Sequence, residues 1–270
     1  MFEIVAHRGA PCLESGDRLT SSASFAPENT LPAFLRALNL GADAVELDVR
    51  LTADWVPVVY HYFYLDENTS FTGAIYQYTW EELRQAQLVR PGRPNNASVS
   101  IPSLEEVLAA LAGRIGLEIE IKGPEEACVE IIASTLKNFP QALKMIEITS
   151  YEIALLERFQ RLMPGLPVDL LIPLSEPWMK ADVLGYTALQ LGKLAGARAV
   201  HLHASQLTLG TMDFIRQGGC DVHAWGINDR QALKTASELQ ITRICTDNLE
   251  LALQFRLEQS IYERMDQSTL

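Results

Sequence analysis

The fold is decided by residues 44–61, which read AVELDVRLTADWVPVVYH. This stretch contains two apolar runs, 44–49 and 56–60, that are typical of buried β-strands. A parallel crossover between two strands needs about a dozen residues or more, and residues 50–55 are too few to form one. The two runs are therefore expected to pair as an antiparallel hairpin.

The turn of this hairpin sets which residues face each other across it. If Asp54 and Trp55 are the two central residues of the turn, counting outward places His61 opposite Asp48. The second hairpin strand would then fold back over one end of the neighbouring strands. We expect this geometry to bring His61 beside the carboxylates of residues 44–49.

Further apolar runs alternate with helical segments along the rest of the chain. Seven more strands are expected near residues 3–6, 117–122, 145–148, 167–172, 198–202, 220–225 and 243–246. Nine strands are one more than a (β/α)₈ barrel contains, and setting the second hairpin strand aside leaves eight parallel strands. We therefore predict an α/β fold, a (β/α)₈ barrel with a small hairpin excursion after its second strand, built as a single domain of residues 1–270.

Helix-starting signals separate these strands. A helix is expected at 30–40, capped by Asn29 or Thr30. Three more helices are expected to open with capping boxes, at residues 79–82, 103–106 and 228–231. This alternation of strands and helices is what a parallel barrel requires.

Composition limits the partners and the location of the protein. The 270 residues carry a formal net charge of −12 at pH 7, which argues against nucleic acid and anionic membrane surfaces as partners. The four cysteines form no CxxC pair and are expected to be free thiols. The first strand is expected to start at Phe2, which leaves no room for a signal peptide, and no apolar stretch approaches the roughly 20 residues of a membrane span. We expect a cytoplasmic protein without stable membrane insertion.

Ionisable residues stand at the carboxyl ends of four expected strands. They are His7 and Arg8, Glu46 and Asp48, His61, and Glu120 and Lys122. The carboxyl ends of parallel strands meet at one mouth of a barrel, where such proteins keep their chemistry. Carboxylate ligands suit one divalent cation, Mg²⁺ or Ca²⁺, better than zinc. The alternative is a buried ion network in which the carboxylates merely pair with Arg8 and Lys122.

Two histidines at this mouth fit acid–base chemistry. A lone histidine at a strand end is more often structural than catalytic, but His7 and His61 beside three carboxylates favour a catalytic pair. Hydrolysis of a phosphodiester needs a base for the attacking oxygen and an acid for the departing one. Imidazole titrates in the right range for both tasks.

Three other features have weaker functional interpretations. The sequence His201-Leu202-His203 is typical of metal-dependent amidohydrolases, but there it belongs to the first barrel strand and here to the seventh, so we expect a local structural pair. Trp225, late in the eighth strand, either packs in the core or contacts substrate at the rim. The apolar stretch Ile172–Tyr186 is compatible with a lid, a lipid contact or a dimer face, with loop packing as the default.

Short blocks of residues along nearly the whole chain follow the order and spacing of motifs in a known protein family. They are His7-Arg8-Gly9, Pro27-Glu28-Asn29-Thr30, Gly41-Ala42-Asp43, Glu46-Leu47-Asp48-Val49, Pro57-Val58-Val59 with His61, Thr72-Gly73, Ile101-Pro102-Ser103-Leu104, Glu120-Ile121-Lys122, Thr149-Ser150-Tyr151, Ala224-Trp225, Ile227-Asn228 and Thr246-Asp247. In their order and spacing these blocks resemble the glycerophosphodiester phosphodiesterases.

This resemblance implies a TIM barrel of the phospholipase-C-like phosphodiesterase type, which hydrolyses glycerophosphodiesters to glycerol 3-phosphate and an alcohol. It also implies a role for each residue at the mouth. One divalent cation is held by Glu46, Asp48 and Glu120. His7 and His61 serve as general acid and base, while Arg8 and Lys122 hold the phosphate.

The chain departs from the family pattern near its expected site. Tyr62 follows His61 where the family usually has aspartate, which would orient the imidazole or raise its pKa. Asp54-Trp55 replaces the usual Asp-Gly of the hairpin turn. The stretch Ala10–Ala26 is longer than the family's usual first loop, and its position beside the first strand suggests a substrate lid.

Two other functions stay open at this point. A lysophospholipase D of the same fold would use the same centre and accept an acyl chain, for which the apolar stretch Ile172–Tyr186 is suited. A non-catalytic protein that binds phosphorylated glycerol derivatives is the other alternative, motivated by Tyr62. The sequence specifies neither the headgroup nor the oligomeric state, and a homodimer is compatible with it.

Overall fold

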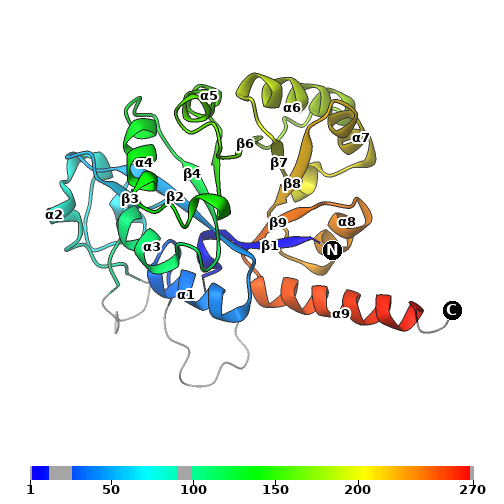
Figure 1. Cartoon of the computed structure of the whole chain (residues 1–270), viewed down its shortest axis with the longest axis horizontal. Coiled ribbons are helices and arrows are strands. Elements are labelled where there is room, and N and C mark those ends of the chain that lie inside the picture. Colours follow the sequence, from blue (N-terminus) through cyan, green and yellow to red (C-terminus); the bar gives the residue numbers. More distant parts are fainter. Residues whose placement is uncertain (1, 12–25, 90–98, 268–270) are drawn as a thin grey trace.

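Eight parallel strands close into a barrel that is surrounded by helices (Figure 1). A computed structural model describes residues 2–11, 26–89 and 99–267. The strands pair in the order β1-β9-β8-β7-β6-β5-β4-β2, and pairing of β1 with β2 closes the ring. Their bounds are β1 Glu3–Ala6, β2 Ala44–Leu51, β4 Gly116–Ile121, β5 Ile146–Ser150, β6 Val168–Leu171, β7 Ala199–His203, β8 Asp221–Trp225 and β9 Arg243–Thr246. The predicted TIM barrel is confirmed.

The helices pack their apolar faces against the outside of the barrel. They are α1 Leu31–Leu40, α3 Leu104–Leu111, α4 Cys128–Lys137, α5 Ile153–Leu162, α6 Ala181–Ala195, α7 Leu209–Gln217, α8 Arg230–Glu238 and α9 Leu249–Gln267. Among the described residues, none of the helices combines the length and the apolar character needed to cross a bilayer.

Helix starts follow the predicted caps in three of four cases. Thr30 caps α1, because its side chain accepts a hydrogen bond from the backbone N–H of Ala33. The capping boxes that begin at Thr79 and Ser103 are both present. At the fourth signal, residues 228–231, the cap is Asp229, one residue later than predicted, and it makes a single cap hydrogen bond to the N–H of Ala232.

The hairpin forms as predicted, but its register differs. Strand β3, Pro57–Val59, runs antiparallel to β2, with Val49 facing Val59. The N–H of Tyr60 donates to the carbonyl of Asp48 at 2.9 Å. The prediction that His61 lies opposite Asp48 is therefore wrong by one residue.

A three-residue loop explains this shift. The N–H of Thr52 donates to the carbonyl of Val56 at 3.1 Å, so residues 53–55 form the loop in place of a two-residue turn. Trp55 occupies the left-handed region with φ of 65°, as the last residue of such three-residue hairpin loops commonly does. The Asp54-Trp55 pair therefore does not act as a mirror-image turn.

The chain between β3 and α3 folds into a small layer beside the barrel (Figure 1). It contains the short helix α2, Trp80–Leu83, and two single helical turns at Leu65–Glu67 and Ile75–Gln77. This layer has its own buried apolar cluster, formed by Val58, Tyr60, Leu65, Ile75, Leu83, Ala86, Leu88 and Ile101. Because Tyr60 is anchored in that cluster, the adjacent His61 has a defined position.

The barrel interior is unusually polar. Interiors of such barrels are normally filled by branched apolar side chains. Here the inward-facing positions hold two groups of ionisable residues. One group, which includes Glu46, Asp48 and Glu120, lies toward the carboxyl ends of the strands, and the other, which includes Glu147, Asp169 and His201, lies toward their amino ends.

Candidate active site

A pocket of about 180 Å³ opens at the carboxyl ends of the strands. Seven of the eight site residues predicted from the sequence line it: His7, Arg8, Glu46, His61, Glu120, Lys122 and Trp225. The eighth, Asp48, is only 1% exposed and pairs with Lys122 and Arg8. The structure thus brings all eight predicted residues together, although no two of the stretches that supply them are adjacent in sequence.

Three carboxylates lie together at this pocket, and two of them, Glu46 and Glu120, line it. Glu46, Asp48 and Glu120 each offer an oxygen, and these oxygens lie within 4.8 Å of one another. Burial, together with the negative charge of Asp48, raises the pKa of Glu46 to about 8 and that of Glu120 to about 7. Such crowding of acidic groups is relieved by a cation, so the donor set fits a divalent metal ion.

Two side-chain cations flank the carboxylates. Lys122 Nζ lies 2.7 Å from Glu120 Oε1 and 3.1 Å from Asp48 Oδ1. Arg8 Nε lies 3.3 Å from Asp48 Oδ2. Burial alone would raise the pKa of Asp48, but the charges of Lys122 and Arg8 hold it well below its usual range. Both cations reach the pocket, where they can also meet an anionic ligand.

A tight turn after β1 positions His7 and Arg8. Arg8 and Gly9 both have positive φ, 50° and 83°, and this turn directs the N–H of Arg8 to Glu46 Oε2 at 2.9 Å. A Cβ on Gly9 would lie 2.8 Å from the Cβ of Ala33 in α1. Glycine is therefore required here both by conformation and by the close approach of α1.

His7 is oriented by a carboxylate from the far end of the chain. Its Nδ1 lies 2.6 Å from Oδ1 of Asp247, which follows β9, and its Nε2 lies 3.9 Å from Glu46 Oε2. Asn228 Nδ2 donates in turn to Asp247 Oδ2 at 2.7 Å. Burial on its own lowers the pKa of His7, but the hydrogen bond to Asp247 and the charge of Glu46 raise it above its usual value.

His61 has the opposite environment. Burial lowers its pKa to about 3, so the imidazole is neutral at pH 7. Its Nδ1 has no hydrogen-bond partner within the described part of the chain. Tyr62, which stands where the family usually has aspartate, packs its ring edge-on against the imidazole with centroids 4.7 Å apart. This apolar contact positions the ring without raising its basicity.

Trp225 and the two histidines of residues 201–203 occupy different depths. Trp225 lines the pocket, its Nε1 has no hydrogen-bond partner among the described residues, and its ring packs against His203 at 4.5 Å between centroids. His201 is 1% exposed and lies inside the barrel with Asp169 and His223. The predicted local pair of His201 and His203 is therefore wrong, because His201 contacts Asp169 and His223 while His203 contacts Ser205 and Trp225.

Sequence reasoning missed three residues that hold this site. Asp247 orients His7. Asn29 donates its amide to Asp48 Oδ2 at 2.7 Å and accepts from the Asp48 N–H at 3.2 Å. Glu28 pairs with Arg8 at 3.2 Å. All three stand in blocks that carry the family resemblance, which was the available signal, but the blocks by themselves do not say which side chains meet. Most of the expected lid, residues 12–25, lies outside the described residues.

The chain is similar to known proteins over most of its length. Residues 7–251 match the model of the glycerophosphoryl diester phosphodiesterase family. A glycerophosphodiester phosphodiesterase of Bacillus altitudinis is 28% identical over 239 residues, which cover 86% of this chain and 94% of that protein.

Solved structures share the fold. The glycerophosphodiester phosphodiesterase of Agrobacterium tumefaciens superposes with a TM-score of 0.74 at 24% identity, covering 93% of this chain and 99% of that one. An Oleispira antarctica phosphodiesterase, solved with the product sn-glycerol-3-phosphate, superposes with a TM-score of 0.71 at 22% identity, covering 93% of this chain and 95% of that one.

Proposed function

The chain belongs to the glycerophosphoryl diester phosphodiesterase family and hydrolyses glycerophosphodiesters, and we propose that it does so at the pocket described above, with one divalent cation and two histidines. The products are glycerol 3-phosphate and an alcohol, a proposal supported by the sn-glycerol-3-phosphate bound to the Oleispira antarctica neighbour. The observation that carries it is the convergence of His7, His61 and three carboxylates on one pocket. Family membership favours this activity over the non-catalytic binding alternative.

The cation site consists of Glu46, Asp48 and Glu120, and its ion is Mg²⁺ or Ca²⁺. An all-carboxylate donor set is the chemistry that hard cations prefer. When bound, the cation stabilises the negative charge that builds up on the phosphate oxygens. Arg8 and Lys122 add two further positive charges at the same pocket, and they bind the phosphate of the substrate.

His7 acts as the general acid and His61 as the general base. Asp247 binds Nδ1 of His7 and raises its pKa, so His7 can deliver a proton from Nε2 to the departing alkoxide oxygen. His61 is neutral and accepts a proton from the attacking water, whose oxygen ends on the phosphate of glycerol 3-phosphate. Paired groups whose environments push their pKa values apart in this way are suited to divided acid and base roles. Trp225 contacts the substrate at the rim.

A coupled assay for glycerol 3-phosphate tests the proposed reaction. Glycerophosphocholine and glycerophosphoethanolamine are supplied to enzyme treated with EDTA, and then with Mg²⁺ or Ca²⁺ restored. Activity is expected to fall below detection with EDTA and to return with one of the two ions. Full activity after exhaustive chelation would overturn the metal role, and absence of glycerol 3-phosphate with every substrate would overturn the product assignment.

A lysophospholipase D activity is the second candidate. Leu171 lines the pocket, and the loop that follows it exposes Leu174 and Trp178 by 60% and 70%. An apolar loop beside the site is suited to an acyl chain. Turnover of lysophosphatidylcholine above that of glycerophosphocholine supports this candidate, and the reverse preference contradicts it.

We further propose a single domain over residues 1–270, a cytoplasmic location and no nucleic-acid partner. The net charge of −12 supports the last of these. The cysteines in the described residues, Cys128, Cys220 and Cys245, are buried free thiols, as is common in a reducing compartment. A homodimer remains a proposal that size-exclusion chromatography with light scattering tests.

A further inference from the structure

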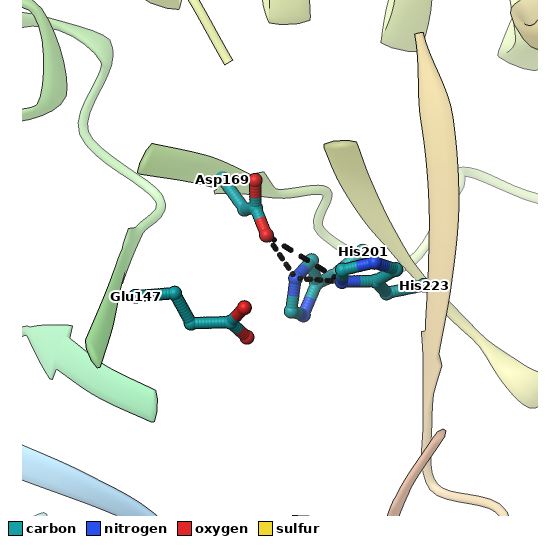
Figure 2. Close-up of side chains that lie close together, drawn as sticks. All are labelled: Glu147, Asp169, His201 and His223. Atoms are coloured by element: carbon teal, nitrogen blue, oxygen red, sulfur yellow. Dashed lines mark hydrogen bonds and ion pairs between the residues drawn. The ribbon is translucent and has the colours of Figure 1, made fainter. Parts of the chain in front are cut away.

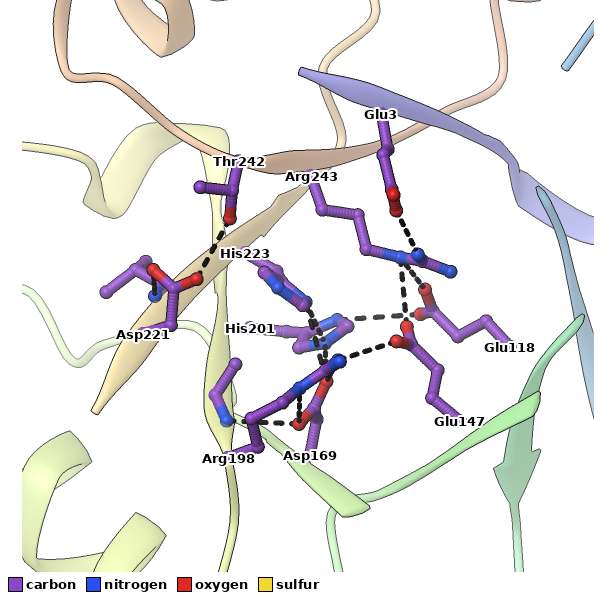
Figure 3. Close-up of polar contacts among 12 residues, drawn as sticks. Glu3, Glu118, Glu147, Asp169, Arg198, His201, Asp221, His223, Thr242 and Arg243 are labelled. Atoms are coloured by element: carbon purple, nitrogen blue, oxygen red, sulfur yellow. Dashed lines mark hydrogen bonds and ion pairs between the residues drawn. The ribbon is translucent and has the colours of Figure 1, made fainter. Parts of the chain in front are cut away.

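A second group of ionisable side chains fills the barrel toward the amino ends of its strands (Figure 3). We call it the basal cluster, and it consists of Glu118, Glu147, Asp169, Arg198, His201, His223 and Arg243. Burying this many charges is costly unless each has a specific partner. The proposed reaction uses none of these residues, so the cluster needs a separate explanation.

Three ligand-type atoms of the basal cluster form a small triangle (Figure 2). Nε2 of His201 lies 3.1 Å from Nδ1 of His223, and Oδ2 of Asp169 lies 3.4 Å from each of these nitrogens. A tetrahedral ion with bonds of about 2.0–2.1 Å separates its ligand atoms by about 3.3–3.4 Å. The triangle therefore already has the dimensions of one face of a tetrahedral site.

Glu147 is placed to supply the fourth ligand. Its carboxylate points toward the His201 ring in Figure 2, and one ligand atom from each of the four residues lies within 4.8 Å of the others. Glu147 is 4% exposed, and in the described part of the chain its Oε1 accepts no hydrogen bond, although Arg243 Nε pairs with it at 3.0 Å. A bound cation would replace Arg243 as the partner of this buried carboxylate oxygen.

Surrounding groups hold the proposed ligands in place. Nδ1 of His201 lies 3.5 Å from Glu118 Oε1, which is the carboxylate partner that metal-bound histidines usually have. Arg198 Nη2 lies 2.6 Å from Asp169 Oδ2 and 2.7 Å from Glu147 Oε2. Because the Arg198 side chain is about half exposed, it can serve as an outer contact or turn toward solvent when a cation enters.

Charge and access also favour a cation. With all three carboxyl groups counted as ionised and both imidazoles as neutral, the two guanidinium groups leave a formal charge of −1. A pocket of about 300 Å³ at the amino ends of the strands, lined by Glu147, Arg198 and Arg243 among others, leads from solvent to the cluster.

We propose that Glu147, Asp169, His201 and His223 form a binding site for one Zn²⁺ ion, separate from the carboxylate site at the mouth. Two imidazoles and two carboxylates suit zinc, whereas the all-carboxylate set suits Mg²⁺ or Ca²⁺. The ion would tie β5, β6, β7 and β8 together inside the barrel. Its function would be structural, because it adds binding free energy to the folded state alone.

Cobalt spectroscopy tests this site without any activity assay. Metal-free protein is titrated with Co²⁺, which absorbs visible light strongly in a tetrahedral site and weakly in an octahedral oxygen site. We expect a strong band that saturates at one equivalent and disappears when Zn²⁺ is added. His223→Asn removes the band. Glu120→Gln, at the mouth, and His203→Asn, on the same strand as His201, both keep it.

A milder variant keeps the test valid if His223→Asn does not fold. Glu118→Gln leaves all four ligands in place and removes the carboxylate that contacts His201 and Arg243, so Zn²⁺ affinity is expected to fall by roughly 10–100-fold. Only weak octahedral absorption in the wild-type protein would overturn the proposal. A strong band that survives His223→Asn and vanishes with Glu120→Gln would overturn it equally. Neither result depends on whether the hydrolytic mechanism is correct.

Discussion

The mouth pocket and the basal cluster contain the same kinds of side chain in the same numbers. The residues assigned to each are three carboxylates, two histidines and two basic residues, and Glu118 of the basal cluster also lines the mouth pocket. At the mouth, His7 and His61 border a cavity, and His7 is held at Nδ1 by Asp247 while its Nε2 lies 3.9 Å from Glu46 Oε2. In the basal cluster, His201 and His223 contact each other and Asp169 at 3.1–3.4 Å.

This difference teaches that composition alone does not identify a catalytic site. Reactive groups need a cavity in which a substrate can meet them, and His7, His61 and Trp225 line one. Groups that satisfy one another serve folding or hold an ion. The following variants test that distinction, in order of decreasing expected effect.

Replacing a histidine at the mouth is expected to have the largest effect on rate. His7→Ala and His61→Ala should each lower kcat by roughly 10²–10⁴-fold, because each removes a proton-transfer group. The matched change in the basal cluster, His201→Ala, should lower kcat of the folded enzyme less than about tenfold. Steady-state kinetics measure kcat of each variant, and circular dichroism checks that it is folded. Equal decreases in kcat for His7→Ala and His201→Ala would show that the mouth and the basal cluster do not differ in catalytic role.

The two glutamates of β4 offer a matched pair for metal affinity. Glu120→Gln should weaken Mg²⁺ or Ca²⁺ binding by about 100-fold or more, since loss of an outer partner alone costs roughly 10–100-fold. Glu118→Gln, two residues earlier on the same face, should change that affinity far less, because Glu118 lines the pocket but does not belong to the group of three carboxylates that could share an ion. Isothermal titration calorimetry reports both values. Unchanged affinity in Glu120→Gln would contradict the ligand assignment.

Stability should depend on the basal cluster. Asp169→Asn is expected to lower the free energy of unfolding by about 3 kcal/mol, the low end for a broken buried pair because Arg198 stays half exposed. Glu157→Gln, in the exposed pair with Arg161, should cost less than about 0.5 kcal/mol. Urea unfolding of the metal-free proteins measures both changes in the free energy of unfolding. Similar changes for the two variants would show that the charges of the basal cluster interact no more strongly than surface charges.

The smallest expected effect is a shift in pH dependence. Asp247 raises the pKa of His7, so Asp247→Asn should lower that pKa. A general acid must be protonated, and a lower pKa means that the proton is lost at lower pH. The alkaline limb of the kcat/KM profile should therefore move toward lower pH, with kcat at pH 7 reduced by about tenfold. A limb that stays in place or moves upward would argue against His7 as the acid.

Much of this architecture could be predicted from local patterns. The strand runs near 3–6 and 243–246 agree with β1 and β9 to the residue, because buried strands need uninterrupted apolar stretches. The predicted hairpin register was wrong by one residue, because the sequence does not show that Trp55 adopts a left-handed conformation and that the loop has three residues. His61 still reaches the pocket because the layer around Tyr60 fixes where β3 ends.

The sequence by itself determined which residues form strands, which of them share a face, and which polar types stand at strand ends, because these properties repeat within a few residues. Only the tertiary structure decided that His7 meets Asp247 and that His201 meets His223 and Asp169. Closing a barrel pairs the first strand with the last and staggers every strand against the next. The depth at which a side chain lies is therefore set by the whole ring and not by its neighbours in sequence.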